Sequence, residues 1–373
     1  MSRSIGIVAP IHISHNIIDY AGLTEGRFKK GFQVVKNSFF KLFALALALT
    51  FCMASSSLAQ RNRTAAASKQ APGLLSALPP SDAVALIKVN RVLDEALPKL
   101  LAENPAKVAE VNAELAKFKA DTGLDPRSFE QIALGLQYTY PSEGVTKIKT
   151  VALARGAFNS GAIVAAGRLA ANGKYQEQKY QGKTVYLFSL DQHIKLAGLW
   201  DFKIRDLAVT ALDGQTLALG DLEAVRGAID ATRTRKYANP ELIALASRDP
   251  DAIVGFGGDV SPQLLENLSI TNNGIARELT AVRKIYGSLG MTSADLELTL
   301  AARTVDAYAA KNLGETVEGL KQLAGLFMGR LSPVKSALAR TALSNLKITT
   351  QGNELQLRTA VAQSQVTPLM KGY

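Results

Sequence analysis

Cysteine and histidine are nearly absent from this 373-residue chain. It contains one cysteine, Cys52, and three histidines, of which only His193 lies beyond residue 59. From residue 60 onward the sequence therefore excludes a disulfide, a thiolate nucleophile and a cysteine metal site. One imidazole also excludes the usual histidine metal clusters and leaves at most a single histidine base. We expect neither a metal nor a cofactor.

Long hydrophobic runs are also missing. The uncharged apolar run from Leu42 to Met53 has twelve residues, whereas a membrane-spanning helix needs about 20. Basic residues precede this run, and the small residues Ser57 and Ala59 follow it. This pattern over residues 27–59 is typical of an export signal with cleavage between Ala59 and Gln60. It predicts a periplasmic or extracellular protein, associated with the envelope or secreted, with no transmembrane segment after cleavage.

Two alternatives to a cleaved signal remain open. Apolar residues upstream of the run, such as Phe39 and Phe40, would suit an uncleaved anchor. Cys52 would suit a lipoprotein signal, although Phe51 stands where a small residue is expected. Export signals normally begin near their charged region. Residues 1–26 are therefore interpreted as a mis-assigned start, with the true start near Val34 or Val35.

The charge balance is moderately basic. The whole chain has a formal net charge of +11. Beyond residue 59 it holds 37 basic and 30 acidic residues, because six of the 43 basic and two of the 32 acidic residues precede that point. The remaining +7 is scattered, which suits an anionic envelope surface and gives no indication of nucleic-acid binding. About 300 residues are enough to bury a core without disulfides.

Hydrophobic periodicity predicts an α+β protein with antiparallel sheets and packed amphipathic helices. Residues 60–77 are small and polar and are expected to form a flexible linker. Two α+β halves are expected to follow, at 78–235 and 249–373. Helices are expected at 91–102, 105–121, 161–171, from 221 onward, and at 305–327. Strands are expected at 83–89, 132–138, 147–157, 175–178, 184–189, 207–212, 216–219, 285–291, 295–303, 346–350 and 354–362.

The two halves look like related copies. Residues 81–86 have a counterpart at 250–255, and each stretch precedes a leucine-rich segment. The hairpin at Gly182 has an expected counterpart in the hairpin around Gly352 and Asn353. Chance similarity between two α+β segments remains the alternative. The helix at 305–327 is expected to bury Val305, Tyr308, Val317, Leu320 and Phe327.

Several motifs resemble catalytic or nucleotide-binding signatures, but their residue spacing or partner motifs differ from those signatures. Residues 182–184 read Gly-Lys-Thr, yet Glu177 occupies the first glycine position of a phosphate loop, so a hairpin is expected. The glycines at 255–258 resemble a dinucleotide loop, but Val260 stands at the third glycine position. Ser332 and Lys335 have the spacing of acyl-transfer enzymes. Without further partner motifs, Ser332 is expected to be the cap of a helix.

The remaining candidate residues are few. His193 is expected in a loop after a strand, facing solvent or bonded locally, with a catalytic base as the weaker alternative. Arg233, Arg235 and Lys236 lie together at a helix end, where cations suit the helix dipole. They are either a solvated terminus or a candidate anion contact. Tyrosines concentrate in the first half, where they would pack on strand faces or contact a carbohydrate or peptide. They are Tyr138, Tyr140, Tyr175, Tyr180 and Tyr186.

Three phrases, at residues 78–85, 217–225 and 296–303, resemble those of exported bacterial proteins that carry a large domain of unknown function. The resemblance covers about residues 78–370 and rests on strand and helix-cap residues. It implies an exported α+β fold and no assigned activity. It implies no catalytic residues.

The sequence thus predicts an exported, non-enzymatic envelope or secreted protein that binds a partner. One form of this hypothesis is a groove between helices and sheet that binds an apolar or polymeric ligand. Another is a partner-binding module, which a large exposed apolar patch without a pocket would favour. The alternative is a carboxylate-dependent hydrolase, which would need two buried carboxylates about 5–10 Å apart in a cleft.

Overall fold

The computed structural model describes residues 73–102, 104–122, 125–196, 200–267, 277–325, 328 and 332–366. The export signal, with Ala59 and Gln60, lies outside the described residues. So does most of the expected linker. Its last residues, however, form a 3-10 helix in which Leu74 and Leu75 are buried. This end of the linker is packed rather than flexible, because two adjacent leucines insert into the main core.

The described chain contains both strands and helices. The strands are β1 (Ala83–Lys88), β2 (Phe129–Ser142), β3 (Val145–Gly156), β4 (Tyr175–Tyr180), β5 (Lys183–Leu196), β6 (Trp200–Asp213), β7 (Thr216–Gly220), β8 (Ala252–Asp259), β9 (Val282–Met291), β10 (Asp295–Thr304), β11 (Lys347–Gln351) and β12 (Glu354–Ala362). The helices are η1 (Leu74–Ala77), α2 (Val89–Arg91), η2 (Val92–Ala96), α3 (Leu97–Leu100), α4 (Pro105–Thr122), η3 (Pro126–Ser128), α5 (Ser160–Ala171), α6 (Leu222–Thr234), α7 (Pro240–Ala246), α8 (Pro262–Asn267), α10 (Ala307–Ala324), α11 (Pro333–Ser344) and α12 (Gln363–Val366). Among these described helices, none has the length and hydropathy that a membrane span requires.

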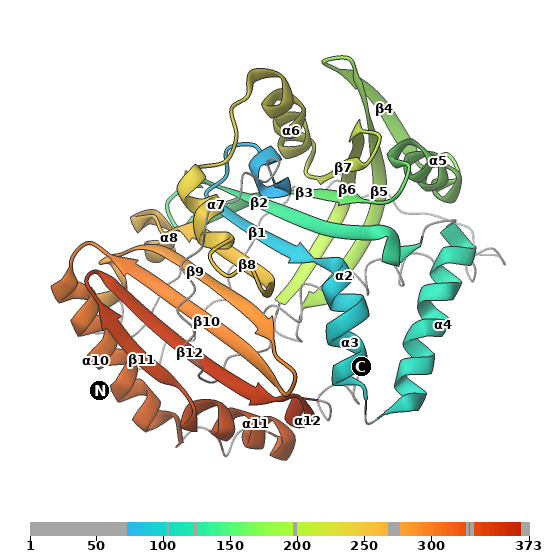
Figure 1. Ribbon diagram of the computed structural model, residues 1–373. Coiled ribbons are helices and arrows are strands. Elements are labelled where there is room, and N and C mark those ends of the chain that lie inside the picture. Colours follow the sequence, from blue (N-terminus) through green and yellow to red (C-terminus); the bar gives the residue numbers. More distant parts are fainter. Residues whose placement is uncertain are drawn as a thin grey trace, which may run out of the picture.

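All twelve strands form one sheet in the order β11-β12-β10-β9-β8-β1-β2-β3-β7-β6-β5-β4. Every neighbouring pair is antiparallel. Figure 1 shows the strands side by side across the molecule, with α6 and α7 towards the top and α10 and α11 at the lower left. The predicted α+β class with antiparallel pairing is confirmed, although the strands build one continuous sheet rather than several.

The middle of the sheet is where the second half of the chain joins the first. In the centre, β1 pairs with β2 on one side and with β8 on the other, so Ala83 lies between Leu136 and Gly258. On one side of the boundary between β1 and β8 the strand order is β1-β2-β3, and on the other side it is β8-β9-β10, so the two sets occupy equivalent positions. Next to these strands lie the hairpins β6–β7 and β11–β12. By position, the counterpart of β11–β12 is therefore β6–β7, not the hairpin at Gly182 that the sequence suggested.

Proline modifies the helix that follows β1. The sequence predicts one helix at 91–102 with a kink at Pro98. The structure instead inserts a π-helical turn, Val92–Ala96, just before the proline. A wider turn accommodates the missing N–H of proline without breaking the helix. Val92 and Ala96 remain buried against the sheet.

The two faces of the sheet carry different helices. One face, here the α6/α7 face, packs against η1, α6 and α7 around buried residues such as Leu153 and Val225. The other, here the α5/α10 face, packs against η2, α5, α10 and α11 in separate smaller clusters. The α6/α7 face therefore holds the main core. The α5/α10 face is covered by helices that pack in several separate, smaller clusters.

Helix α10 buries a different stripe from most of the one expected, although the predicted Val317 does pack against a core cluster. Val305, Tyr308 and Leu320 are exposed by 50%, 74% and 43%. Instead Ala309, Ala310, Leu313 and Gly314 face the sheet. A Cβ on Gly314 would lie 3.0 Å from the Thr350 hydroxyl. Small residues let the helix approach the sheet closely, and this contact outweighs the larger hydrophobic side chains on its other side. Phe327 lies outside the described residues.

Candidate functional site

The three basic candidates lie at the end of α6. The Arg233 guanidinium donates a hydrogen bond to the Gln181 side chain in the β4–β5 turn. Arg235 adopts a left-handed conformation with φ of 57° and ends the helix, and Lys236 is exposed. Arg233 thus holds the hairpin, and an anion contact at this end of α6 stays a prediction.

The other motifs have structural roles. Residues 182–184 belong to the β4–β5 hairpin, as predicted, with left-handed φ values of 49° and 79° at Gln181 and Gly182. The glycines of β8 allow α7 to lie on the strand, because a Cβ at Gly255 would be 2.0 Å from the Ala246 carbonyl oxygen. Ser332 occupies the cap position of α11 but makes no side-chain capping bond. The backbone of His193 lies within β5, not after it.

The strand register creates an apolar surface in the middle of the α5/α10 face. Direct partners in a sheet point to the same side. Ala83 in β1 pairs with Leu136 and Gly258, Ala85 pairs with Phe256, and Gly258 pairs with Ile285. The same relations add further side chains from β2, β3 and β10. We call this surface the open apolar face, and it comprises Leu136, Tyr138, Ile148, Phe256, Ile285, Leu298 and Leu300.

Helices surround the open apolar face without burying it. Its seven side chains belong to none of the six hydrophobic clusters found among the described residues. Ile148, Ile285 and Leu300 are exposed by 53%, 42% and 37%, and the other four are half-buried. The face spans six adjacent strands from β3 to β10, which corresponds to about 24 Å at the usual strand spacing.

The open apolar face carries no ionised side chain. Burial, followed by the nearby Asp82 carboxylate, raises the pKa of Tyr138 to about 12, so this phenol stays neutral at physiological pH. At one edge, α8 is anchored by polar contacts. The Tyr140 and Ser261 hydroxyls lie 2.5 Å apart, and the Asn267 amide donates to Thr146. The face is therefore suited to uncharged apolar groups.

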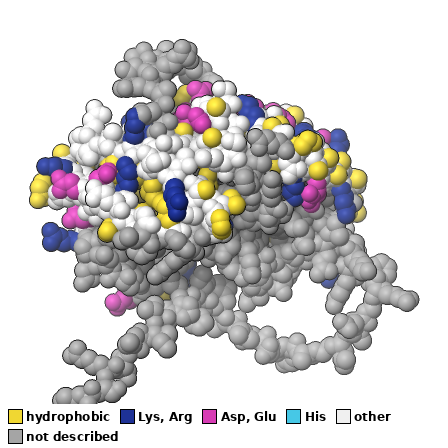
Figure 2. Space-filling view, turned by 90° about the horizontal axis from the view of Figure 1, so that it is seen from below, with side chains coloured by type: hydrophobic (Ala, Val, Ile, Leu, Met, Phe, Trp, Pro, Cys, Tyr) yellow, Lys and Arg dark blue, Asp and Glu magenta, His cyan; other side chains and the backbone are white. Residues whose placement is uncertain are grey.

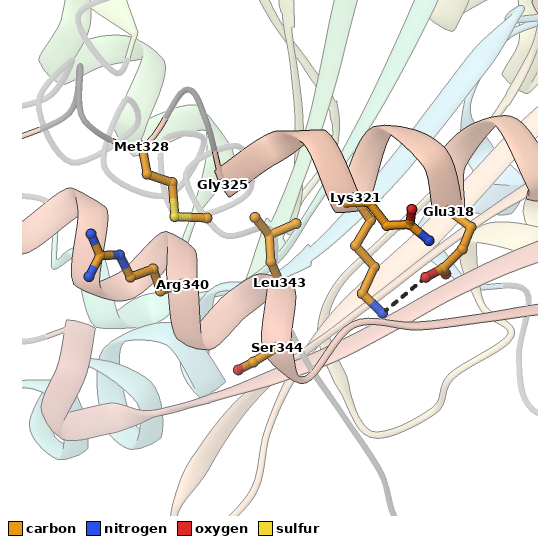
Figure 3. Close-up of a pocket in the computed structure, with 8 residues that line it drawn as sticks. Glu318, Lys321, Gly325, Met328, Arg340, Leu343 and Ser344 are labelled. Atoms are coloured by element: carbon orange, nitrogen blue, oxygen red, sulfur yellow. Dashed lines mark ion pairs between the residues drawn. The ribbon is translucent and has the colours of Figure 1, made fainter.

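A separate shallow groove of about 480 Å³ lies between α10 and α11. Figure 3 shows Arg340 at one end, the Lys321–Glu318 pair at the other, and Leu343 between them. The Lys321 ammonium lies 3.8 Å from Glu318 and donates to the Leu346 carbonyl oxygen at 2.9 Å. One of the two cations of this groove is thus already engaged, and the groove is open to solvent.

Most well-placed carboxylates are held in ion pairs rather than facing each other. Arg303 lies between Glu241 and Glu354, with nitrogen–oxygen distances of 2.5 and 2.7 Å. Lys284 lies between Glu241 and Asp259, at 3.2 and 2.5 Å. The cations lower the pKa of Glu241, chiefly through the Lys284 hydrogen bond. We call these charges, together with Arg248, the α7 ion network, and it joins α7 to the sheet.

One carboxyl differs from this pattern. Burial, and then the neighbouring Asp249 and Asp295 carboxylates, raise the pKa of Glu297 in β10. Asp249 accepts a hydrogen bond from Ser288 at 3.1 Å. Within the described ranges, no group of three or more histidine, cysteine or acidic residues could hold a metal ion.

The described surface that is visible from below shows no broad area of one charge (Figure 2). Seen from below, hydrophobic side chains lie in several small areas between basic, acidic and uncharged polar groups (Figure 2). This fits the scattered basic excess of the sequence. It gives no support to a nucleic-acid surface, which would gather its cations on one face.

Sequence reasoning missed the open apolar face, apart from naming Tyr138 as an aromatic. The available signal was that β9 and β10 are apolar at alternate positions, including Ile285, Leu298 and Leu300. That alternation says which side chains share a face. Only the packing of helices reveals which of those faces is left uncovered.

Comparison with known proteins identifies no family and only distant structural likeness. No known protein family matches the sequence, and no curated protein matches it at a significant level. Two solved structures with some likeness are crystal forms III and I of TP0453, at 9% and 10% sequence identity. Their TM-scores are 0.41 and 0.38, and the alignments cover 80% and 82% of this chain and 98% of each of those chains. At this level of similarity, neither structure bears on the function of this chain.

Proposed function

We propose that the chain is an exported, non-enzymatic protein of the envelope or the secreted fraction, which binds an apolar partner on the open apolar face. The observation that carries the proposal is that face: an uncharged band across six strands, partly exposed in the midst of packed helices. The signal-like residues 27–59 support export.

Exposed apolar surface has a physical cost. Fully burying one isoleucine or leucine side chain contributes about 1.5–3 kcal/mol relative to leaving it exposed. Soluble proteins rarely expose a contiguous apolar area unless it takes part in binding. Ile148, Ile285 and Leu300 together would therefore supply much of the binding free energy of a partner with a complementary apolar surface.

Native mass spectrometry tests this proposal. The full precursor is expressed, and the exported chain is purified and measured before and after denaturation. A small released mass would identify a ligand, and a co-purified chain would identify a protein partner. The double variant Ile285→Lys/Leu300→Lys should no longer carry the ligand or the co-purified chain. Two ammonium groups cannot be buried against an apolar partner.

The matched control is Leu169→Lys. Leu169 is 83% exposed on α5 and lies outside the open apolar face, so this variant should keep the partner. Binding of an apolar fluorescent dye should fall in the double variant and not in the control. The proposal would be contradicted if the exported chain carried no ligand or partner and if the wild type, the double variant and the control bound the dye equally.

A carboxylate-dependent hydrolase is the second candidate, because burial and the neighbouring Asp249 and Asp295 carboxylates raise the pKa of Glu297. Acid–base hydrolysis uses pairs of carboxyl groups whose environments differ. If Glu297 has only a structural role, Glu297→Gln should stabilise the fold at neutral pH, since the raised pKa means that ionisation disfavours the folded state. This gain should vanish below about pH 4, where the unfolded carboxyl is also protonated. Loss of a measured hydrolytic activity in this variant would favour the enzyme.

A further inference from the structure

A small pocket lies between α5 and the outer strands of the sheet, away from the open apolar face. Its volume is about 240 Å³, and it is lined by one side of α5, from Gly161 to Arg168, and by Thr184 and Tyr186 of β5. It is hollow because the helix presents small residues there, including Gly161 and Ala165. The volume is below the 300–1,000 Å³, roughly, of sites for drug-sized ligands, so it suits a single ring.

Arg168 is held rigidly at the wall of this pocket. Its guanidinium carbon lies 5.4 Å from the ring centroid of Tyr175 and 5.3 Å from that of Tyr186. The Nε group donates to the Tyr175 hydroxyl at 3.1 Å, and Nη2 lies 3.0 Å from Glu177. Stacking and hydrogen bonds fix the planar group, so little conformational entropy is lost when a ligand binds.

Arg168 is the one charged residue that lines the pocket, and Glu177, which lies outside the lining, neutralises it. An anion would have to displace this carboxylate, and an apolar ligand would leave the polar wall unsatisfied. The Tyr186 hydroxyl has no hydrogen-bond partner in the part of the chain that the structure describes, although the ring itself is stacked on Arg168. The Tyr186 hydroxyl and ring and the Arg168 guanidinium therefore line one small volume.

The hairpin that carries these groups is also fixed from its opposite side. The Tyr180 hydroxyl donates to Asp230 of α6 at 2.7 Å, and Arg226 of α6 donates to Gln178 at 2.7 Å. Because α6 and α5 hold opposite faces of the β4–β5 hairpin, the pocket is preorganised. Preorganisation matters most for a ligand that is itself strongly hydrated.

We propose that this pocket binds one ring of a neutral saccharide, with its hydroxyl groups bonded to Tyr186 and Arg168. A sugar presents neighbouring hydroxyls that match the planar guanidinium and the phenol beside it, and its apolar ring face suits the tyrosine. The site is independent of the open apolar face, and it gives Tyr186, one of the five tyrosines of the first half, a binding role.

Isothermal titration of the full exported chain with maltotriose, cellotriose and chitotriose tests the proposal. At least one of them should bind. Ala165→Leu should weaken that binding about tenfold or more, a loss of about 1.4 kcal/mol, because the larger side chain fills the pocket without touching the Arg168 contacts. Tyr186→Phe should weaken it by removing the free hydroxyl while keeping the ring.

Leu169→Ala is the control, since Leu169 is 83% exposed on the same helix and does not line the pocket. It should bind as the wild type does, and so should Ile285→Lys, which alters only the open apolar face. Thermal unfolding of each variant shows that the fold is retained. The proposal is overturned if none of the three saccharides binds, if Ala165→Leu binds them unchanged, or if inorganic phosphate competes for the site.

Discussion

At the scale of single residues, two glycines have opposite roles. A Cβ at Gly255 in β8 would lie 2.0 Å from the Ala246 carbonyl oxygen, whereas nothing lies within 4 Å of a Cβ at Gly319 in α10. We expect Gly255→Ala to destabilise the protein by about 1–3 kcal/mol, because α7 must move off the strand. Gly319→Ala should stabilise it by about 0.5–1 kcal/mol, since alanine favours a helix interior. Chemical denaturation measures the free energy of unfolding of both variants. If both substitutions changed it equally, the close contact between α7 and β8 would be contradicted.

Asp221 is another residue whose role depends on a distant partner. Its position before α6 predicts a helix cap, but its side chain makes no capping bond. The carboxylate instead accepts a hydrogen bond from the Thr150 backbone N–H at 2.6 Å. It therefore fixes the start of α6 to β3, which places the helix over the main core.

At the scale of elements, the α7 ion network holds a short helix to four strands. Glu354 of β12 contacts Arg303 of β10 and Arg248, which follows α7. Burial works against its ionised form, but hydrogen bonds from Arg303 and Tyr286 and the charge of Arg248 outweigh burial and lower the pKa of Glu354. A carboxyl with a lowered pKa stabilises the fold above its unfolded pKa and loses this contribution as the pH falls through its folded pKa.

We therefore expect Glu354→Gln to reduce the free energy of unfolding by about 1–3 kcal/mol at neutral pH. The difference from wild type should shrink as the pH falls below about 4. The control is Glu110→Gln, which disrupts an exposed pair with Lys107 on α4 and should change stability by about 0–1 kcal/mol. Denaturation over a pH series measures both, and a pH-independent loss in Glu354→Gln would contradict the electrostatic account.

At the scale of the whole molecule, the continuous sheet couples the two predicted halves. The main core contains Leu153 and Val225 from the first half together with Tyr286 and Ala301 from the second. Because β1 pairs with both β2 and β8, neither half can unfold without exposing a strand edge of the other. We expect one cooperative unfolding transition.

The single tryptophan, Trp200 in β6, reports on the first half, and circular dichroism reports on the whole chain. The two urea transitions should coincide. Leu289→Ala, a change at a buried residue of β9, should cost about 2–5 kcal/mol and shift both transitions together. A tryptophan transition that stays in place while the circular dichroism transition becomes biphasic would show that the halves unfold separately.

The sequence by itself determined most of the elements, although not α7, and it determined the excluded chemistries. Hairpins at Gly182 and Gly352 follow from turn residues, and strands such as β9 and β10 follow from alternation, because both signals are local. The lack of cysteine beyond residue 59 and the single histidine there excluded whole classes of site without any structure.

Only the tertiary structure decided how those elements share surfaces. It joined both halves into one sheet, turned the small side of α10 inward instead of Tyr308 and Leu320, and left Ile285 and Leu300 uncovered. It also brought Arg168 beside Tyr175 and Tyr186. These outcomes depend on contacts between residues far apart in the chain. Local periodicity shows that a helix or strand has an apolar face, but the available partners decide which face is buried.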